Sequence, residues 1–71
     1  MNAGLDIDLI KAEHDNIEAK LHNLISFMGS DEYLELNNEM RSLCYQKKYF
    51  IHEYLDALVK QLCLLGHKFD D

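Results

Sequence analysis

The sequence predicts an all-α fold, a helical hairpin of long helix, short helix and long helix that assembles as a helical-bundle homo-oligomer. Three observations favour this fold. The 71 residues contain no proline, Gly29 and Gly66 fall where helices should end, and apolar residues recur in steps of three and four. A chain of this length forms a single domain, residues 1–71, in which we expect residues 1–4 and 67–71 to be frayed.

The first predicted helix covers residues 5–28 and carries one apolar seam. Asp6 and Asp8 lie in its first turn, where the positive end of the helix dipole favours anions. The seam has coiled-coil spacing, and the opposite face is polar. We expect an oligomer seam of Ile7, Ile10, His14, Ile17, Leu21 and Leu24, continued by Met28. Such a seam must pack against the rest of the chain or against another copy of it.

A short helix over residues 31–36 is predicted next. Gly29 is expected at the C′ position of the first helix, in the left-handed conformation that glycine adopts without strain. Ser30 is a good N-cap for the short helix, and Asn37 or Asn38 for the helix that follows. The apolar side chains that the short helix should turn towards the core are Tyr33, Leu34 and Leu36.

The third predicted helix covers residues 38–65 and is stopped by Gly66. Its apolar stripe is wider than a coiled-coil seam, because adjacent positions such as 43 and 44 are both apolar. The stripe consists of Met40, Leu43, Cys44, Phe50, Ile51, Tyr54, Leu55, Leu58, Leu62 and Leu65. A stripe this wide indicates two neighbours. One is the first helix, and we expect the other to be a second subunit.

Composition restricts the partners and the compartment. A net charge of −6 disfavours DNA, RNA and anionic membrane surfaces, and the longest apolar run is too short to span a bilayer. Cys44 and Cys63 lie about 28 Å apart along one predicted helix, too far for a disulfide within the chain. Two reduced thiols fit a cytoplasmic protein, and the acidic start of the chain lacks the basic region of a signal peptide.

Two runs of residues carry a family resemblance. The first is Glu13-His14-x2-Ile17-x2-Lys20-Leu21-x2-Leu24-x2-Phe27 followed by Ser30-x2-Tyr33-x2-Leu36, and the second is Leu43, Gln46, Phe50, Tyr54 and Leu58. Together they resemble short all-helical phage accessory proteins of the kind catalogued in crAss-like phages. The resemblance covers roughly residues 7–62 and implies a small helical phage protein, with no catalytic residues to transfer. Cys44 and Gln61 depart from the family pattern, which commonly has a leucine and a basic residue there.

The sequence favours neither a metal site nor an active site. His14, Glu18 and His22 are spaced four apart, but the chain has no Glu-x-x-His or His-x3-His pair and no cysteine pair at zinc spacing. At a seam position, a histidine more often fixes helix register or oligomeric state. We therefore predict no metal, no cofactor and no catalytic residue.

A basic and aromatic stripe on the third predicted helix is the strongest candidate for a ligand site. It consists of Arg41, Tyr45, Lys48, Tyr49 and His52. Arginine and lysine bind phosphate, and aromatic rings stack on bases. The stripe therefore predicts binding of a phosphorylated or nucleotide ligand. The alternative is a solvated face whose tyrosines pack on a neighbouring subunit.

Two non-enzymatic functions fit these features. In the first, the chain is a phage anti-defence protein that self-associates and sequesters a cyclic or linear nucleotide signal of host defence at a subunit interface, in the cytoplasm. In the second, it is a protein-interaction module that inhibits or adapts a host or phage protein through its acidic or apolar faces.

Overall fold

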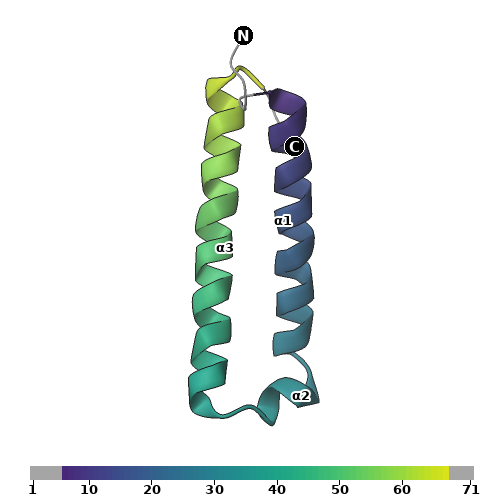
Figure 1. The fold of residues 1–71 in the computed structure, drawn as a ribbon, viewed down its shortest axis with the longest axis vertical. Coiled ribbons are helices and arrows are strands. Elements are labelled where there is room, and N and C mark those ends of the chain that lie inside the picture. The colour runs from purple at the N-terminus through teal and green to yellow at the C-terminus, as the bar shows by residue number, and fades with distance from the viewer. Residues whose placement is uncertain (1–5, 68–71) are drawn as a thin grey trace.

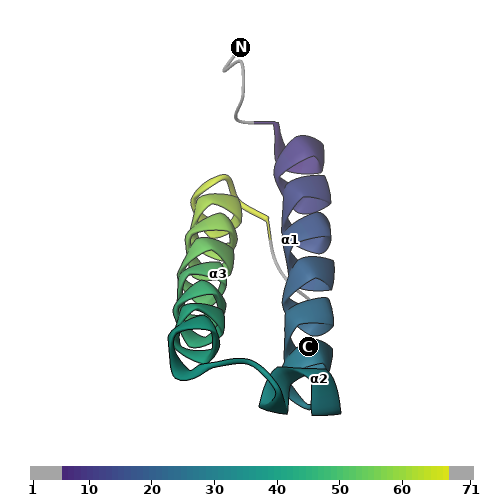
Figure 2. The ribbon, with the colours of Figure 1, turned by 60° about the horizontal axis from the view of Figure 1, so that its bottom comes forward.

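The computed structural model describes residues 6–67 and forms a helical hairpin. Its helices are α1 (Ile7–Met28), α2 (Asp31–Leu34) and α3 (Asn38–Leu64). The two long helices lie side by side and run antiparallel, and α2 lies where the chain turns back (Figures 1 and 2). The prediction of an all-α hairpin is thus confirmed for a single chain, whereas its assembly into an oligomer stays a prediction.

The first helix begins at Ile7 rather than at residue 5, because Asp6 caps it. The Asp6 carboxylate accepts hydrogen bonds from the backbone N–H groups of Asp8 at 2.7 Å and Leu9 at 3.4 Å. These are among the N–H groups that the start of a helix leaves without partners. Asp6 therefore stabilises the start of α1 by capping it as well as by its charge.

Gly29 ends α1, but not in the predicted conformation. It is the C-cap residue, with φ −95° and ψ 5°, so the prediction of a left-handed Gly29 at the C′ position is wrong. The Gly29 N–H donates to the carbonyls of Ile25 and Ser26. The next N–H, that of Ser30, donates to the Phe27 carbonyl at 3.0 Å. These bonds close the turn with ordinary negative dihedrals, and the chain continues directly into α2.

The single turn of α2 buries only one side chain. Ser30 caps it by accepting a hydrogen bond from the Tyr33 N–H at 3.3 Å. Tyr33 is buried and Leu36 is half-buried, but Leu34 is 66% exposed, so the prediction that Leu34 faces the core is wrong. Successive residues of a helix point about 100° apart. Because Tyr33 points into the hairpin, Leu34 faces solvent.

The third helix begins and ends with well-formed caps. The Asn37 side chain accepts a hydrogen bond from the Met40 N–H at 2.8 Å. At the other end, the Gly66 N–H donates to the Cys63 carbonyl at 3.0 Å and the His67 N–H to the Leu62 carbonyl at 2.9 Å. With a φ of 87° at Gly66, this is a Schellman motif. The predicted glycine stop is therefore confirmed here.

The sequence also predicts frayed termini at residues 1–4 and 67–71. His67 is described, and its N–H belongs to the cap of α3. Residues 1–4 and 68–71 lie outside the described residues.

We expect alanine at the two glycines to have opposite effects. Gly66→Ala should destabilise the fold by about 1 kcal/mol, because an alanine strains at a φ of 87°. Gly29→Ala should be neutral or stabilise by up to about 1 kcal/mol, because it restricts the unfolded chain. A methyl group at Gly29 would meet its nearest atom, the Ser26 carbonyl oxygen, at an ordinary 3.7 Å. Urea denaturation of both variants measures the difference, and equal midpoints would contradict it.

The α1 seam packs inside the hairpin. Its seven predicted residues, Ile7, Ile10, His14, Ile17, Leu21, Leu24 and Met28, are all buried or half-buried, and nearly all other residues of α1 are exposed. On α3 and its C-cap, a matching series with the same spacing is buried or half-buried: Arg41, Cys44, Lys48, Ile51, Leu55, Leu58, Leu62 and Leu65. The two series meet as in an antiparallel coiled coil.

The main part of the core lies at one end of the hairpin. Ile10, Leu58 and Leu62 form its buried cluster, near the start of α1 and the end of α3 (Figure 1). Four partly buried residues pack around it: Ile7, Ile17, Leu55 and Leu65. Towards α2 the α3 series becomes charged, since Lys48 and Arg41 belong to it. The seam is therefore wholly apolar on α3 at one end of the hairpin and carries two cations at the other.

Much of the wide α3 stripe stays in contact with solvent. Its outer members, Met40, Leu43, Phe50 and Tyr54, are between 44% and 58% exposed. Burying apolar surface stabilises by about 25 cal/mol per Å², so this surface favours a second neighbour. The structure supplies only the first predicted neighbour, α1.

Candidate functional site

The basic and aromatic stripe lies on the half of α3 nearest α2. Arg41 and Lys48 are half-buried at the edge of the seam with α1, whereas His52 is exposed. The rings of Tyr45 and Tyr49 are about 60% exposed. The five predicted residues therefore occupy one flank of the hairpin. Its two cations are half-buried, and its aromatic side chains are exposed.

Tyr33 of α2 packs against this flank. Its ring makes edge-to-face contacts with Phe27, at a centroid distance of 6.1 Å, and with Tyr45, at 6.5 Å. Burial and then the adjacent Tyr45 raise the pKa of Tyr33, and the positive charge of Arg41 opposes this rise. The ring contact places Tyr33 beside Tyr45, so α2 helps to fix one end of the stripe.

Most of the described cations lack an acidic partner. Within residues 6–67, the one ion pair that joins a lysine or arginine to a carboxylate links Lys60 to Asp56, at 2.8 Å. This contact raises the pKa of Lys60. The Arg41 guanidinium instead donates to the side-chain oxygen of Asn38 at 2.7 Å, which is a neutral group. Although the chain has thirteen acidic residues, none of those described pairs with Arg41 or Lys48. These two half-buried cations are therefore available to bind an anionic ligand.

A second group of charged residues lies near the middle of α1. One possible ligand atom from each of His14, Asp15 and Glu18 lies within 4.8 Å of the others. The His14 Nδ1 lies 3.3 Å from the Asp15 carboxylate. The sequence singled out His14 and Glu18 but paired them with His22, which this cluster lacks. Asp15 and Glu18 are exposed on a single helix, so the cluster alone does not define a metal site.

A groove with two lysines runs between α1 and α3. One hollow is lined by Lys20, Asn23, Leu24, Phe27, Lys47 and Ile51. The adjoining hollow is lined by Ile17, Lys47, Phe50, Ile51 and Tyr54. Because Lys47 and Ile51 line both, the hollows form one continuous surface, which we call the lysine groove. Lys47 flanks the basic and aromatic stripe in the sequence, and Lys20 belongs to the first run of the family resemblance, but only the register of the two helices brings the two lysines together.

The lysine groove lies on the other flank of the hairpin from the basic and aromatic stripe. Lys47 and Phe50 line the groove, whereas Lys48 and Tyr49, each one residue away, belong to the stripe and point about 100° around the helix. Beside the groove, the Tyr54 hydroxyl donates a hydrogen bond to the Glu13 carboxylate and so links α3 to α1. This bond raises the pKa of Tyr54.

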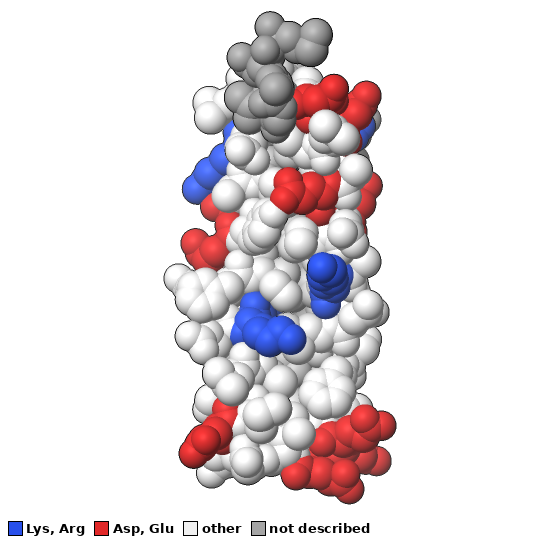
Figure 3. All heavy atoms as spheres, viewed as in Figure 1, with Lys and Arg blue, Asp and Glu red and all other residues white. Residues whose placement is uncertain are grey.

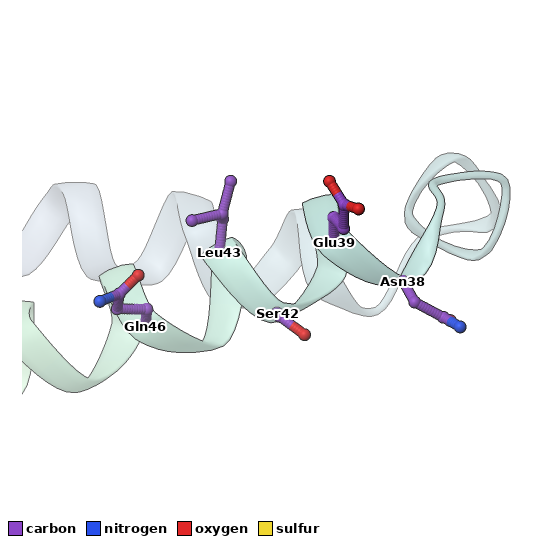
Figure 4. Close-up of a pocket in the computed structure, with 5 residues that line it drawn as sticks. All are labelled: Asn38, Glu39, Ser42, Leu43 and Gln46. Atoms are coloured by element: carbon purple, nitrogen blue, oxygen red, sulfur yellow. The ribbon is translucent and has the colours of Figure 1, made fainter.

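A further hollow lies on α3 alone. Its lining residues are Asn38, Glu39, Ser42, Leu43 and Gln46. Their side chains project from successive turns of one helix and do not converge on a common point (Figure 4). A ligand site needs polar groups that converge on a bound molecule, so this hollow is a weaker candidate than either flank.

No family model, curated protein or solved structure matches this chain. The resemblance to short phage proteins therefore stays a prediction. None of the helices in the described part of the chain is both long and apolar enough to cross a membrane.

Proposed function

We propose that this protein is a non-enzymatic, self-associating phage accessory protein that binds and sequesters a small phosphorylated or nucleotide signal where its subunits meet. One observation carries the proposal. Arg41 and Lys48 are half-buried cations with no acidic partner among the described residues, and the exposed rings of Tyr45 and Tyr49 lie beside them.

The charges favour an anion as the missing partner. Arg41 has a neutral acceptor in Asn38, but neither Arg41 nor Lys48 has a partner of opposite charge among the described residues. A partly buried cation without such a partner costs free energy. A phosphate would supply this partner, since arginine can bind two of its oxygens and lysine adds a point charge. The Tyr45 and Tyr49 rings offer apolar faces on which a base can stack.

Self-association would complete the same site. A single hairpin presents this flank as an open surface, and a bound nucleotide would remain largely in water there. A second copy placed against the flank would cover the two exposed tyrosines and supply the opposite wall, with a second set of cations. The resemblance to small phage proteins suggests the class of signal, a nucleotide of host defence.

Calorimetry with a panel of cyclic and linear nucleotides tests this proposal. Arg41→Ala and Lys48→Ala should each weaken binding of the best ligand by about tenfold or more, because each removes a charged partner of the phosphate. Lys60→Ala is the matched control, since Lys60 is an exposed lysine on the same helix that is already paired with Asp56. Its affinity should equal that of the wild type.

The ionic strength and the solution mass complete the test. Binding should weaken as salt rises, and light scattering should give at least twice the 8.3 kDa chain mass. If no nucleotide in the panel releases heat or raises the melting temperature, the nucleotide proposal fails. If the three alanine variants bind equally, the ligand occupies some other surface.

A protein-interaction module is the second candidate, and the lysine groove favours it. Phe50 and Tyr54, two exposed apolar residues of α3, line this groove, on the flank that the nucleotide proposal does not use. A helical hairpin with an apolar groove between its helices is suited to bind a third helix.

A further inference from the structure

The lysine groove has the dimensions and lining of a helix-binding surface. Along α1 it extends from Ile17 to Phe27, which is about 15 Å, or nearly three helical turns. Its α3 wall contains Phe50, Ile51 and Tyr54. Phe50 is 58% exposed, and its ring would be covered by a helix lying between α1 and α3. Two antiparallel helices with an apolar groove thus lack only the third member of a three-helix bundle.

The charges of the groove determine the chemistry of its partner. Lys20 and Lys47 enter it from opposite helices, and neither has a carboxylate within 4 Å among the described residues. On the face drawn in Figure 3, basic side chains lie at mid-length over both long helices, with acidic side chains above and below them. A partner helix should therefore carry carboxylates at mid-length on both sides of an apolar stripe.

A second copy of the chain fits this groove poorly. Two copies that packed these faces together around a twofold axis near mid-length would bring Lys20 and Lys47 of both copies together. Like charges at a desolvated interface cost free energy. The mid-length position of the two lysines therefore favours a partner of opposite charge over self-docking.

We infer that the lysine groove binds an acidic amphipathic helix of another protein. The apolar stripe of that helix packs on Phe27, Phe50 and Ile51, and its carboxylates pair with Lys20 and Lys47. This inference is independent of nucleotide binding, since it uses the opposite flank of the hairpin.

Two designed peptides test the charge requirement on the full-length protein. Each has about fifteen residues, enough for four helical turns, with leucines in steps of three and four. One carries glutamates beside the leucines, and the other carries lysines at the same positions. In fluorescence anisotropy, the glutamate peptide should bind at least about tenfold more tightly, and added salt should reduce the difference. Equal affinities would overturn the inference.

Two double variants locate the binding surface. Lys20→Glu with Lys47→Glu should weaken the glutamate peptide by about tenfold or more and strengthen the lysine peptide. Lys11→Glu with Lys60→Glu is the matched control, because it changes the net charge by the same amount as the groove variant. It also replaces one exposed lysine on each long helix, and both lysines lie outside the groove. If the control loses as much affinity as the groove variant, net charge explains the binding and the inference fails.

A third variant and one mass measurement complete the test. Phe50→Ser should weaken the glutamate peptide severalfold through lost apolar contact, whereas Leu64→Ser, at an 88% exposed position of the same helix, should not. The groove double variant should keep the wild-type mass in light scattering and the wild-type affinity for nucleotides. A loss of oligomers in that variant would assign the groove to a second copy and overturn the inference.

Discussion

Replacing Leu62 with alanine should lower the free energy of unfolding by about 2–5 kcal/mol. Leu62 is the one fully buried large side chain of the described residues, and it packs with Ile10 and Leu58 at the centre of the only buried cluster there. A domain of this length has a total stability of roughly 4–10 kcal/mol. The variant should therefore lose a large part of its stability, and its melting temperature should fall by at least about 10 °C.

Leu64→Ala is the matched control for this prediction. Leu64 is two residues away on the same helix but is 88% exposed, so its truncation removes little buried surface and should change stability by less than about 0.5 kcal/mol. Circular dichroism during heating measures both variants. Equal melting temperatures would contradict the position of the core between α1 and the end of α3.

Replacing Tyr33 with alanine should also be severe, at about 3–5 kcal/mol. Tyr33 is the one buried residue of α2, and its ring contacts Phe27 of α1 and Tyr45 of α3. Without it, α2 loses its one buried side chain. We expect α2 to detach and the half of the hairpin nearest to it to open.

The neighbouring residue again provides a control. Leu34→Ala removes a side chain of similar apolar character that is 66% exposed, so it should be nearly neutral. Tyr33→Phe keeps the ring contacts and should retain most of the stability. Urea denaturation compares the three variants. A Tyr33→Ala variant as stable as Leu34→Ala would show that α2 contributes nothing to the fold.

The spacing of apolar residues predicted the helices and the buried face of α1 well, because all the apolar residues of the seam lie on one side of the helix and that side must pack inwards. Ile10 and Leu21 lie in that seam, and both are buried. Capping residues were equally informative: Ser30 and Asn37 both accept hydrogen bonds from N–H groups of the helices that they precede. These signals are local, so the sequence carries them directly.

The errors arose where the outcome depends on neighbours rather than on residue type. Leu34 is apolar, but Tyr33 already fills the space beside α2. Gly29 can adopt a left-handed conformation, but the bonds around it close the turn without one. Lys20 and Lys47 lie far apart in sequence, and only the antiparallel register of the two helices brings them to one groove.

The chain itself connects the two long helices at the α2 end, whereas the buried cluster lies at the other end. At the α2 end, the short covalent connection keeps the helices at a high effective concentration, so Arg41 and Lys48 can occupy seam positions with few apolar contacts. At the other end the described residues contain no connection between the helices, and the cluster of Ile10, Leu58 and Leu62 holds them together. The two ends of the hairpin are therefore held in different ways: the connection and the buried ring of Tyr33 hold the α2 end, and the cluster of aliphatic side chains holds the other.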